Sequence, residues 1–101
     1  SLLFMDEPFS ALDYENTIRM RERLQEYYLR RKPTILFVSH DIEEAVHMAS
    51  TIIVLSRRPT RVLEIIRNPA PYPRSVEALN GEESRLIKDK VLSAFRSAAH
   101  V

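Results

Sequence analysis

Two adjacent carboxylates, Asp6 and Glu7, directly follow a short apolar run near the start of the chain. The run, at positions 2–5, predicts a strand buried on both faces, as strands of parallel sheets are. Open α/β sheets bind ligands beyond the carboxyl ends of their strands, so we expect both carboxylates at that edge. There, one carboxylate suits the magnesium ion of a nucleotide, and its neighbour can deprotonate an attacking water. A solvated acidic turn after a strand is the alternative.

A third candidate group, His40, follows a second apolar and β-branched run at positions 34–38. If the two runs form neighbouring parallel strands, His40 lies at the same edge as the carboxylates. A histidine there could donate a hydrogen bond to a terminal phosphate and sense its loss, although an isolated histidine is more often structural or exposed. His47 and His100 have no such setting, and we predict that both are surface residues.

Two longer segments resemble a single protein family. Residues 6–13, DEPFSALD, closely resemble the Walker B and D-loop region of ABC transporter ATPases, and residues 35–45, ILFVSHDIEEA, resemble that family's switch-histidine segment. Residues 53–56 and 58–62 resemble the last strands of importer ATPases for nitrate, sulfonate and taurine. The resemblance implies an α/β fold, the C-terminal part of a P-loop NTPase (ABC ATPase) domain, with a mostly parallel sheet, crossover helices and a C-terminal helix.

The resemblance also implies a role for each candidate residue. Glu7 matches the catalytic base for ATP hydrolysis, Asp6 matches the aspartate that helps to hold Mg²⁺, and His40 matches the switch histidine. Ser10 and Asp13 fall in the D-loop, which in the family lies at the dimer interface and couples two ATP sites. Capping of the following helix is the alternative role for Asp13. The implied cofactors are ATP and Mg²⁺.

The implied function is that of the ATP-hydrolysing subunit of an importer for a small solute, with an anion such as nitrate, sulfonate or taurine as the expected cargo. The expected partners are a second ATPase subunit, a transmembrane permease and, indirectly, a solute-binding protein. The expected location is cytoplasmic, at the inner face of the membrane through the permease. A nucleic-acid-linked ABC ATPase and a non-catalytic remnant that acts as a binding module remain alternatives.

Several motifs of a complete family domain are missing from these 101 residues. A phosphate-binding loop needs two glycines and a lysine, whereas the chain has one glycine, Gly81. The family's Leu-Ser-Gly-Gly signature and its glutamine-bearing loop are also missing, and Ser1 opens directly onto a predicted core strand. We therefore expect a chain cut before that strand, which alone neither binds ATP tightly nor hydrolyses it.

The composition excludes several other classes. A hydrophobic content of 45% is sufficient for a packed core, and the net charge of +1 gives no reason to expect a nucleic-acid partner. The absence of cysteine excludes disulfides and thiolate metal sites. No apolar stretch approaches the roughly 20 residues that a membrane span needs, and no signal-peptide pattern is present.

The helices are expected to position these groups. A helix over 14–31, ended by Pro33, carries an imperfect apolar stripe with outward-facing charged residues between its members. The stripe is Ile18, Leu24 and Tyr28, and the outward residues are Arg19, Arg21, Glu22 and Arg23. A second helix is predicted to begin at a cap-like pair, Asp41 and Glu44.

Two strands and a further helix complete the expected order. Strands at 51–55 and 61–67 are joined by a short turn that contains Pro59. They close a partial ATPase domain at 1–67, which a proline-containing extended linker at 68–81 joins to a helical segment at 82–101. The predicted docking face of that last helix is Leu86, Ile87, Val91, Leu92 and Phe95.

Overall fold

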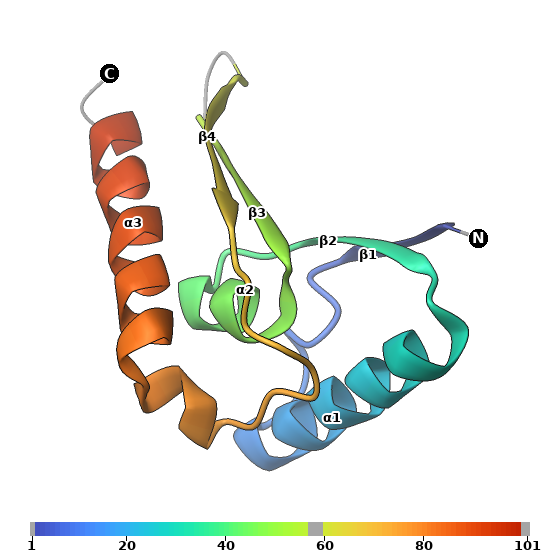
Figure 1. Cartoon of the computed structure of the whole chain (residues 1–101). Coiled ribbons are helices and arrows are strands. Elements are labelled where there is room, and N and C mark those ends of the chain that lie inside the picture. The colour runs from blue at the N-terminus through green and yellow to red at the C-terminus, as the bar shows by residue number, and fades with distance from the viewer. Residues whose placement is uncertain (1, 57–59, 100–101) are drawn as a thin grey trace.

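A computed structural model describes residues 2–56 and 60–99 of the chain, and its elements follow the predicted order (Figure 1). They are β1 (Leu2–Asp6), α1 (Tyr14–Arg31), β2 (Thr34–Val38), α2 (Ile42–Met48), β3 (Thr51–Leu55), β4 (Val62–Arg67), the 3₁₀ helix η1 (Glu77–Asn80) and α3 (Glu82–Ala99). None of the helices described is long and apolar enough to cross a membrane.

The strands form two separate sheets. β1 pairs with β2 in parallel, and β3 pairs with β4 in an antiparallel hairpin. Within residues 2–56 and 60–99, the single mostly parallel sheet expected from the resemblance is therefore not formed. The connections explain the pairing, because α1 provides the crossover that parallel strands need, whereas the short link after β3 permits an antiparallel neighbour. Pro59, predicted in that link, lies outside the described residues.

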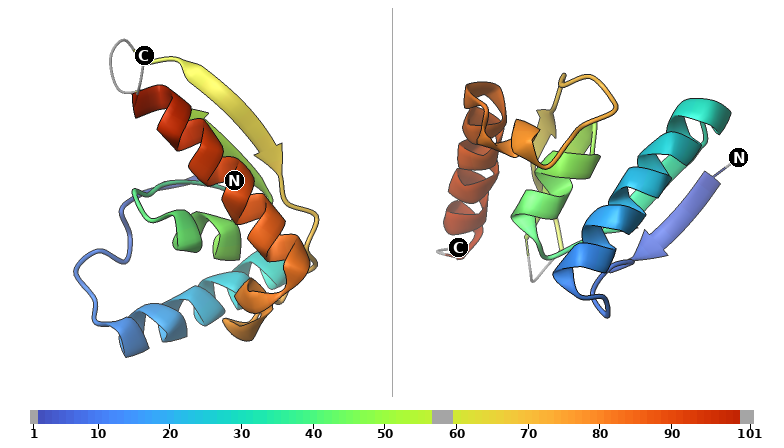
Figure 2. Two further views of the ribbon diagram at one scale, coloured as in Figure 1. Left: turned by 90° about the vertical axis from the view of Figure 1, so that its left-hand side faces the viewer. Right: turned by 90° about the horizontal axis from the view of Figure 1, so that it is seen from below.

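The apolar core lies around the hairpin and not around the parallel pair. One face of the hairpin packs against α2, η1 and α3, with α3 running alongside β3 and β4 (Figures 1 and 2). Along β3 the side chains alternate between exposed and buried, as a strand with one covered face does. The buried members of this core are Val46, Ile52, Val54, Ile66, Leu79, Ile87 and Val91.

The parallel pair has one face that the described elements leave open. Leu2 and Phe4 on β1 are 67% and 63% exposed, and Leu36 on β2, paired with Phe4, is 49% exposed. The intervening residues of both strands are half-buried. The prediction that β1 is buried on both faces is therefore wrong for this structure, because the described elements cover only one of its faces.

Helix α1 begins and ends where the sequence predicts. The Asp13 carboxylate accepts a hydrogen bond from the Asn16 backbone N–H at 2.8 Å, which confirms the capping role. The helix ends at Arg31, and the capping residue Lys32 has a left-handed backbone and donates its N–H to the Tyr28 carbonyl at 2.8 Å. The prediction that Arg21 faces outward is wrong, since Arg21 and Gln25 are the buried residues of this helix.

Residues 68–76, here called the strap, are folded against the helices, whereas the prolines predict an extended linker. Gln25 of α1 accepts from the Arg74 backbone N–H at 2.6 Å and donates to the Arg74 carbonyl at 3.0 Å. Tyr72 packs against Tyr28 with ring centroids 5.2 Å apart and donates its hydroxyl to the Met48 carbonyl. The prolines exclude helix and strand, but polar contacts with α1 and α2 hold the strap in place.

The face of α3 that docks differs in part from the prediction. Ile87 and Val91 are buried as expected, whereas Leu86 and Phe95 are 56% and 41% exposed. The buried face of α3 also includes Ser84. This face lies against the hairpin and η1, and it does not coincide with the most apolar face of the helix. Apolar content alone therefore does not predict which face docks.

Candidate active site

The parallel register brings the candidate residues to one edge. Asp6, the last residue of β1, pairs with Val38, the last residue of β2. The Glu7 backbone N–H donates to the Val38 carbonyl at 2.8 Å, which extends the pairing by one residue. Glu7 has a φ of 49°, a left-handed backbone that glycine adopts more easily than other residues. The chain therefore turns sharply at Glu7.

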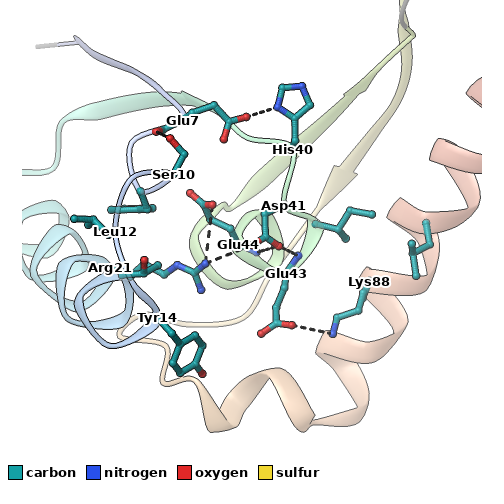
Figure 3. A pocket seen from close by; sticks show the side chains of 14 residues that line it. Glu7, Ser10, Leu12, Tyr14, Arg21, His40, Asp41, Glu43, Glu44 and Lys88 are labelled. Atoms are coloured by element: carbon teal, nitrogen blue, oxygen red, sulfur yellow. Dashed lines mark hydrogen bonds and ion pairs between the residues drawn. The ribbon is translucent and has the colours of Figure 1, made fainter.

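Glu7 and His40 are in direct contact at this edge, where their side chains point toward each other (Figure 3). The contact joins the Glu7 Oε1 and the His40 Nδ1. Because a carboxylate only accepts, the histidine donates from Nδ1, either as a neutral ring or as an imidazolium. The Glu7 side chain is 29% exposed and the His40 ring 89% exposed, so the ring can turn toward another acceptor.

The turn at residues 7–13 uses the other two candidates locally. The Ser10 hydroxyl donates to the Glu7 carbonyl at 3.2 Å, and Phe9 is buried beneath the turn. Asp13 faces the first turn of α1 as its cap and does not reach the Glu7 and His40 pair. Ser10 thus supports the backbone at Glu7, whereas Asp13 fixes the start of the helix.

Asp6 is the candidate for holding Mg²⁺. It is exposed at the end of β1, and in the part of the chain that the structure describes no group of three or more His, Asp or Glu side chains could hold a metal. Magnesium sites on nucleotides commonly use only one or two carboxylates, with phosphate and water completing the coordination. A single exposed carboxylate therefore fits an ion that arrives with a nucleotide, and does not fit a site built from the protein alone.

The segment that carries His40 is held by its neighbours. Asp41 caps α2 by accepting from the backbone N–H groups of Glu43 and Glu44, at 3.0 and 3.3 Å. The Ser39 hydroxyl donates to Glu44 Oε2 at 3.1 Å and accepts from the Asp41 N–H at 3.0 Å. The Glu44 carboxylate therefore pairs with the Ser39 hydroxyl. The predicted cap-like pair would instead have placed that carboxylate at Asp41, at the start of α2. Burial raises the pKa of Glu44, and the Ser39 hydrogen bond and Arg21 partly offset this rise.

Arg21, which the sequence predicts to face outward and not to belong to a site, enters this site from α1 (Figure 3). Its Nη2 lies 3.9 Å from Asp41 Oδ2 and 4.0 Å from Glu44 Oε2. Its guanidinium carbon also lies 6.0 Å from the centre of the Phe9 ring, within reach of a cation–π contact. The available signal is spacing, since Arg21 and Gln25 lie four residues apart on one face of the helix.

His47 is buried, with 1% of its surface exposed, so its prediction as a surface residue is wrong. Arg21 Nη1 lies 3.3 Å from His47 Nδ1, and because arginine only donates, Nδ1 accepts. Nε2 then carries the proton and donates to the Arg74 carbonyl at 2.9 Å. Burial lowers the pKa of His47, and the charges of Arg21 and Arg74 lower it further, against the Arg74 carbonyl. His100 lies outside the described residues.

Glu7, His40 and Arg21 are among the residues that line one open cleft of about 870 Å³ between the turn at 7–13, α1, α2 and α3 (Figure 3). Glu7 and His40 lie at one side, and the buried pair of Arg21 and Glu44 lies in the wall. A Lys88 to Glu43 ion pair at 4.0 Å links α3 to the same cleft. The lining residues are Glu7, Phe9, Ser10, Leu12, Tyr14, Thr17, Arg21, His40, Asp41, Ile42, Glu43, Glu44, Lys88 and Leu92.

The chain has relatives among proteins of known name. It is 38% identical over 95 residues to the aliphatic sulfonates import ATP-binding protein SsuB of one Bacillus cereus strain, and 37% identical over 95 residues to SsuB of a second strain of that species. A Brucella abortus protein whose name describes it as ATP-binding is 38% identical over 93 residues. These matches cover 94%, 94% and 92% of this chain. They cover 37%, 37% and 36% of the relatives. No protein-family model matches the chain.

Proposed function

Because the chain belongs to the ABC ATP-binding proteins over the 37% of their length that it spans, we propose that it supplies the catalytic edge of an ATP-hydrolysing domain. The observation that carries the proposal is the contact between Glu7 and His40 at the ends of two adjacent parallel strands. At such an edge the carboxylate can accept a proton, and the histidine can donate a hydrogen bond to a phosphate.

In this proposal Glu7 acts as the general base. Its carboxylate accepts a proton from a water molecule while the water oxygen bonds to the γ-phosphorus, and the bond from that phosphorus to the bridging oxygen of ADP breaks. His40 exchanges its contact with Glu7 for a hydrogen bond to a γ-phosphate oxygen, so it senses the loss of that group. Mg²⁺, when bound, offsets phosphate charge, and Asp6 would hold it through one carboxylate.

The wider role proposed is transport. Two of the relatives are named as import ATP-binding proteins for aliphatic sulfonates, which supports a small anion, such as a sulfonate, taurine or nitrate, as cargo. The partners would be a second ATPase subunit, with Ser10 and Asp13 at the shared interface, a membrane permease and a solute-binding protein. The location would be cytoplasmic, at the inner face of the membrane through the permease.

The test uses the gene product that contains these residues. Glu7→Gln keeps the size of the side chain but removes the base, so turnover should fall by about 10²–10⁴-fold while ATP binding is retained. The matched control is Glu22→Gln, at an exposed position on α1, which should leave turnover unchanged. Phosphate release and ATP titration calorimetry measure the two quantities. Unchanged turnover in Glu7→Gln would refute the role of Glu7.

We further propose that the 101-residue chain alone is inactive, because it has only one glycine and so carries no phosphate-binding loop of the family's type. Titration of the pure chain with Mg-ATP should give no tight binding and no phosphate release. Salt-dependent binding of nucleic acid by the gene product would favour the nucleic-acid-linked class instead. Stable folding of that product without nucleotide affinity would favour a non-catalytic remnant.

A further inference from the structure

We propose that Arg21 is a positioning residue that couples the turn carrying Glu7 to the segment carrying His40. The proposal rests on the proposed function, since positioning matters only if these two groups act on a common substrate. Arg21 lies on α1, outside both segments, and is 5% exposed. A buried arginine on the helix between two functional segments can fix their separation only if it contacts both.

The first contact is with the turn. The Arg21 guanidinium carbon lies 6.0 Å from the centre of the Phe9 ring, and Phe9, two residues after Glu7, is 7% exposed. The Ser10 hydroxyl, next to Phe9, donates to the Glu7 carbonyl. A shift of Arg21 would therefore move the buried anchor of the turn, and Glu7 with it.

The second contact is with the segment that carries His40. Arg21 Nη2 lies 3.9 Å from Asp41 and 4.0 Å from Glu44. Glu44 in turn accepts from the Ser39 hydroxyl at 3.1 Å. Ser39 and Asp41 flank His40, so both backbone neighbours of the histidine are joined, directly or through Glu44, to the arginine. Figure 3 shows the contacts of Arg21 with Asp41 and Glu44.

The Arg21 to Glu44 pair also has a tighter form available. The two buried atoms Arg21 Nε and Glu44 Oε1 have no hydrogen-bond partner among the residues described. Nε and Nη2 are the two donors of one fork of the guanidinium, which matches the two oxygens of a carboxylate. A small approach of α1 and α2 would convert the 4.0 Å contact into a bidentate pair and satisfy both atoms.

Substitution of Arg21 in the gene product tests the coupling. Both Arg21→Lys and Arg21→Met should lower kcat about 10-fold, with KM for ATP changed less than about 2-fold, because misplaced groups slow chemistry more than they weaken binding. Lysine should not rescue, because it keeps the charge but lacks the fork. Arg23→Gln, at an exposed position on the same helix, is the matched control and should leave kcat unchanged.

A double-mutant cycle separates coupling from a loss of stability. The cycle compares kcat of Arg21→Met, of Glu44→Gln and of the double variant. If Arg21 acts through Glu44, kcat of the double variant should equal the lower of the two single-variant values. Multiplied losses would overturn the coupling. Ser39→Ala removes the next link without touching the buried arginine and should lower kcat about as much, so the test holds even if Arg21→Met does not fold.

The same assays distinguish a failure of the positioning role of Arg21 from a failure of the proposed function. If Glu7→Gln is inactive while Arg21→Lys keeps full kcat, the positioning role of Arg21 is wrong and the proposed function stands. If Glu7→Gln keeps its turnover, the proposed function itself fails. Full rescue by lysine would assign Arg21 a role in charge balance alone, which also overturns the proposal.

Discussion

The hairpin region and the parallel pair of strands differ in what holds them. Around β3 and β4, seven apolar side chains from the hairpin, α2, η1 and α3 form a closed cluster. At β1 and β2, Leu2, Phe4 and Leu36 remain largely exposed, and the edge that carries Glu7 and His40 is held by backbone pairing and polar contacts. Apolar burial thus stabilises one region, whereas the candidate site lies on the other.

The difference shows where the two regions are joined. Between them lie polar contacts of α1 with α2 and the strap, made by Arg21, Gln25, His47 and Arg74. Buried polar groups of this kind contribute little net stability while they are paired but cost much when one partner is lost. The stability of the core should therefore respond to lost volume, and the junction to lost hydrogen bonds and to pH.

The largest effect is expected from a cavity in the closed core. Ile87 and Leu86 are neighbours on α3, but Ile87 is 6% and Leu86 56% exposed. Ile87→Ala should lower the free energy of unfolding by about 2–5 kcal/mol, because it removes apolar atoms and leaves a cavity. Leu86→Ala should change it by less than about 0.5 kcal/mol. Urea denaturation followed by circular dichroism measures both, and equal losses would contradict the separation of the regions.

The next effect is expected at the strap. The Arg74 guanidinium donates to the carbonyls of Ala49 at 2.7 Å, Ala70 at 2.7 Å and Asn68 at 3.2 Å. Arg74→Lys should cost about 2–3 kcal/mol, since one ammonium group cannot reach all these carbonyls and buried acceptors lose their partners. The control is Arg67→Lys, at an exposed position on β4. Stability equal to the wild type in Arg74→Lys would show that the strap is held by other contacts.

The smallest effect is a dependence on pH through His47. Burial and two arginines keep its folded pKa below the ordinary value of 6.5, so the unfolded chain binds more protons in the window between the two. Stability should therefore fall as the pH drops below 6.5, by at most about 1.4 kcal/mol per pH unit. His47→Gln should remove this part of the slope.

Glu44 contributes a pH dependence of stability that is opposite in direction to that of His47. Its folded pKa is raised, so the folded state binds more protons, and its contribution falls as the pH rises above 4.5. The two groups act in opposite directions: stability falls through Glu44 as the pH rises above 4.5, and falls through His47 as the pH drops below 6.5. Only the difference between wild type and His47→Gln isolates the histidine, and identical pH dependence in the two proteins would contradict its assignment.

Local signals predict much of this fold. Asp13 caps α1, which was the alternative role for it, the residues after Pro33 form β2, and the contact of Glu7 with His40 follows from two apolar runs that end at one sheet edge. Each of these depends on neighbours in the sequence or on the geometry of parallel strands. For that reason the positions of the candidate residues at one sheet edge are predictable from the sequence.

The errors concern residues whose partners lie far along the chain. Arg21 and His47 are polar residues on helix surfaces, and only contacts over 26 and 27 residues, to each other and to Arg74, bury them. The strap has three prolines that predict an extended segment, but distant Gln25 binds its backbone. Local hydrophobic periodicity contains no information about such partners.

The backbone at Glu7 has a consequence for how this sequence can evolve. A φ of 49° costs glutamate about 1–2 kcal/mol and costs glycine little, although glycine loses about 0.5–1 kcal/mol more chain entropy on folding, so a glycine there would be expected to stabilise the chain by at most about 1 kcal/mol. Selection for stability alone would favour the replacement, and selection for chemistry would oppose it. Lineages that have lost the reaction should therefore accumulate glycine or asparagine at this position. The residue found there would then indicate whether a related protein still catalyses the reaction.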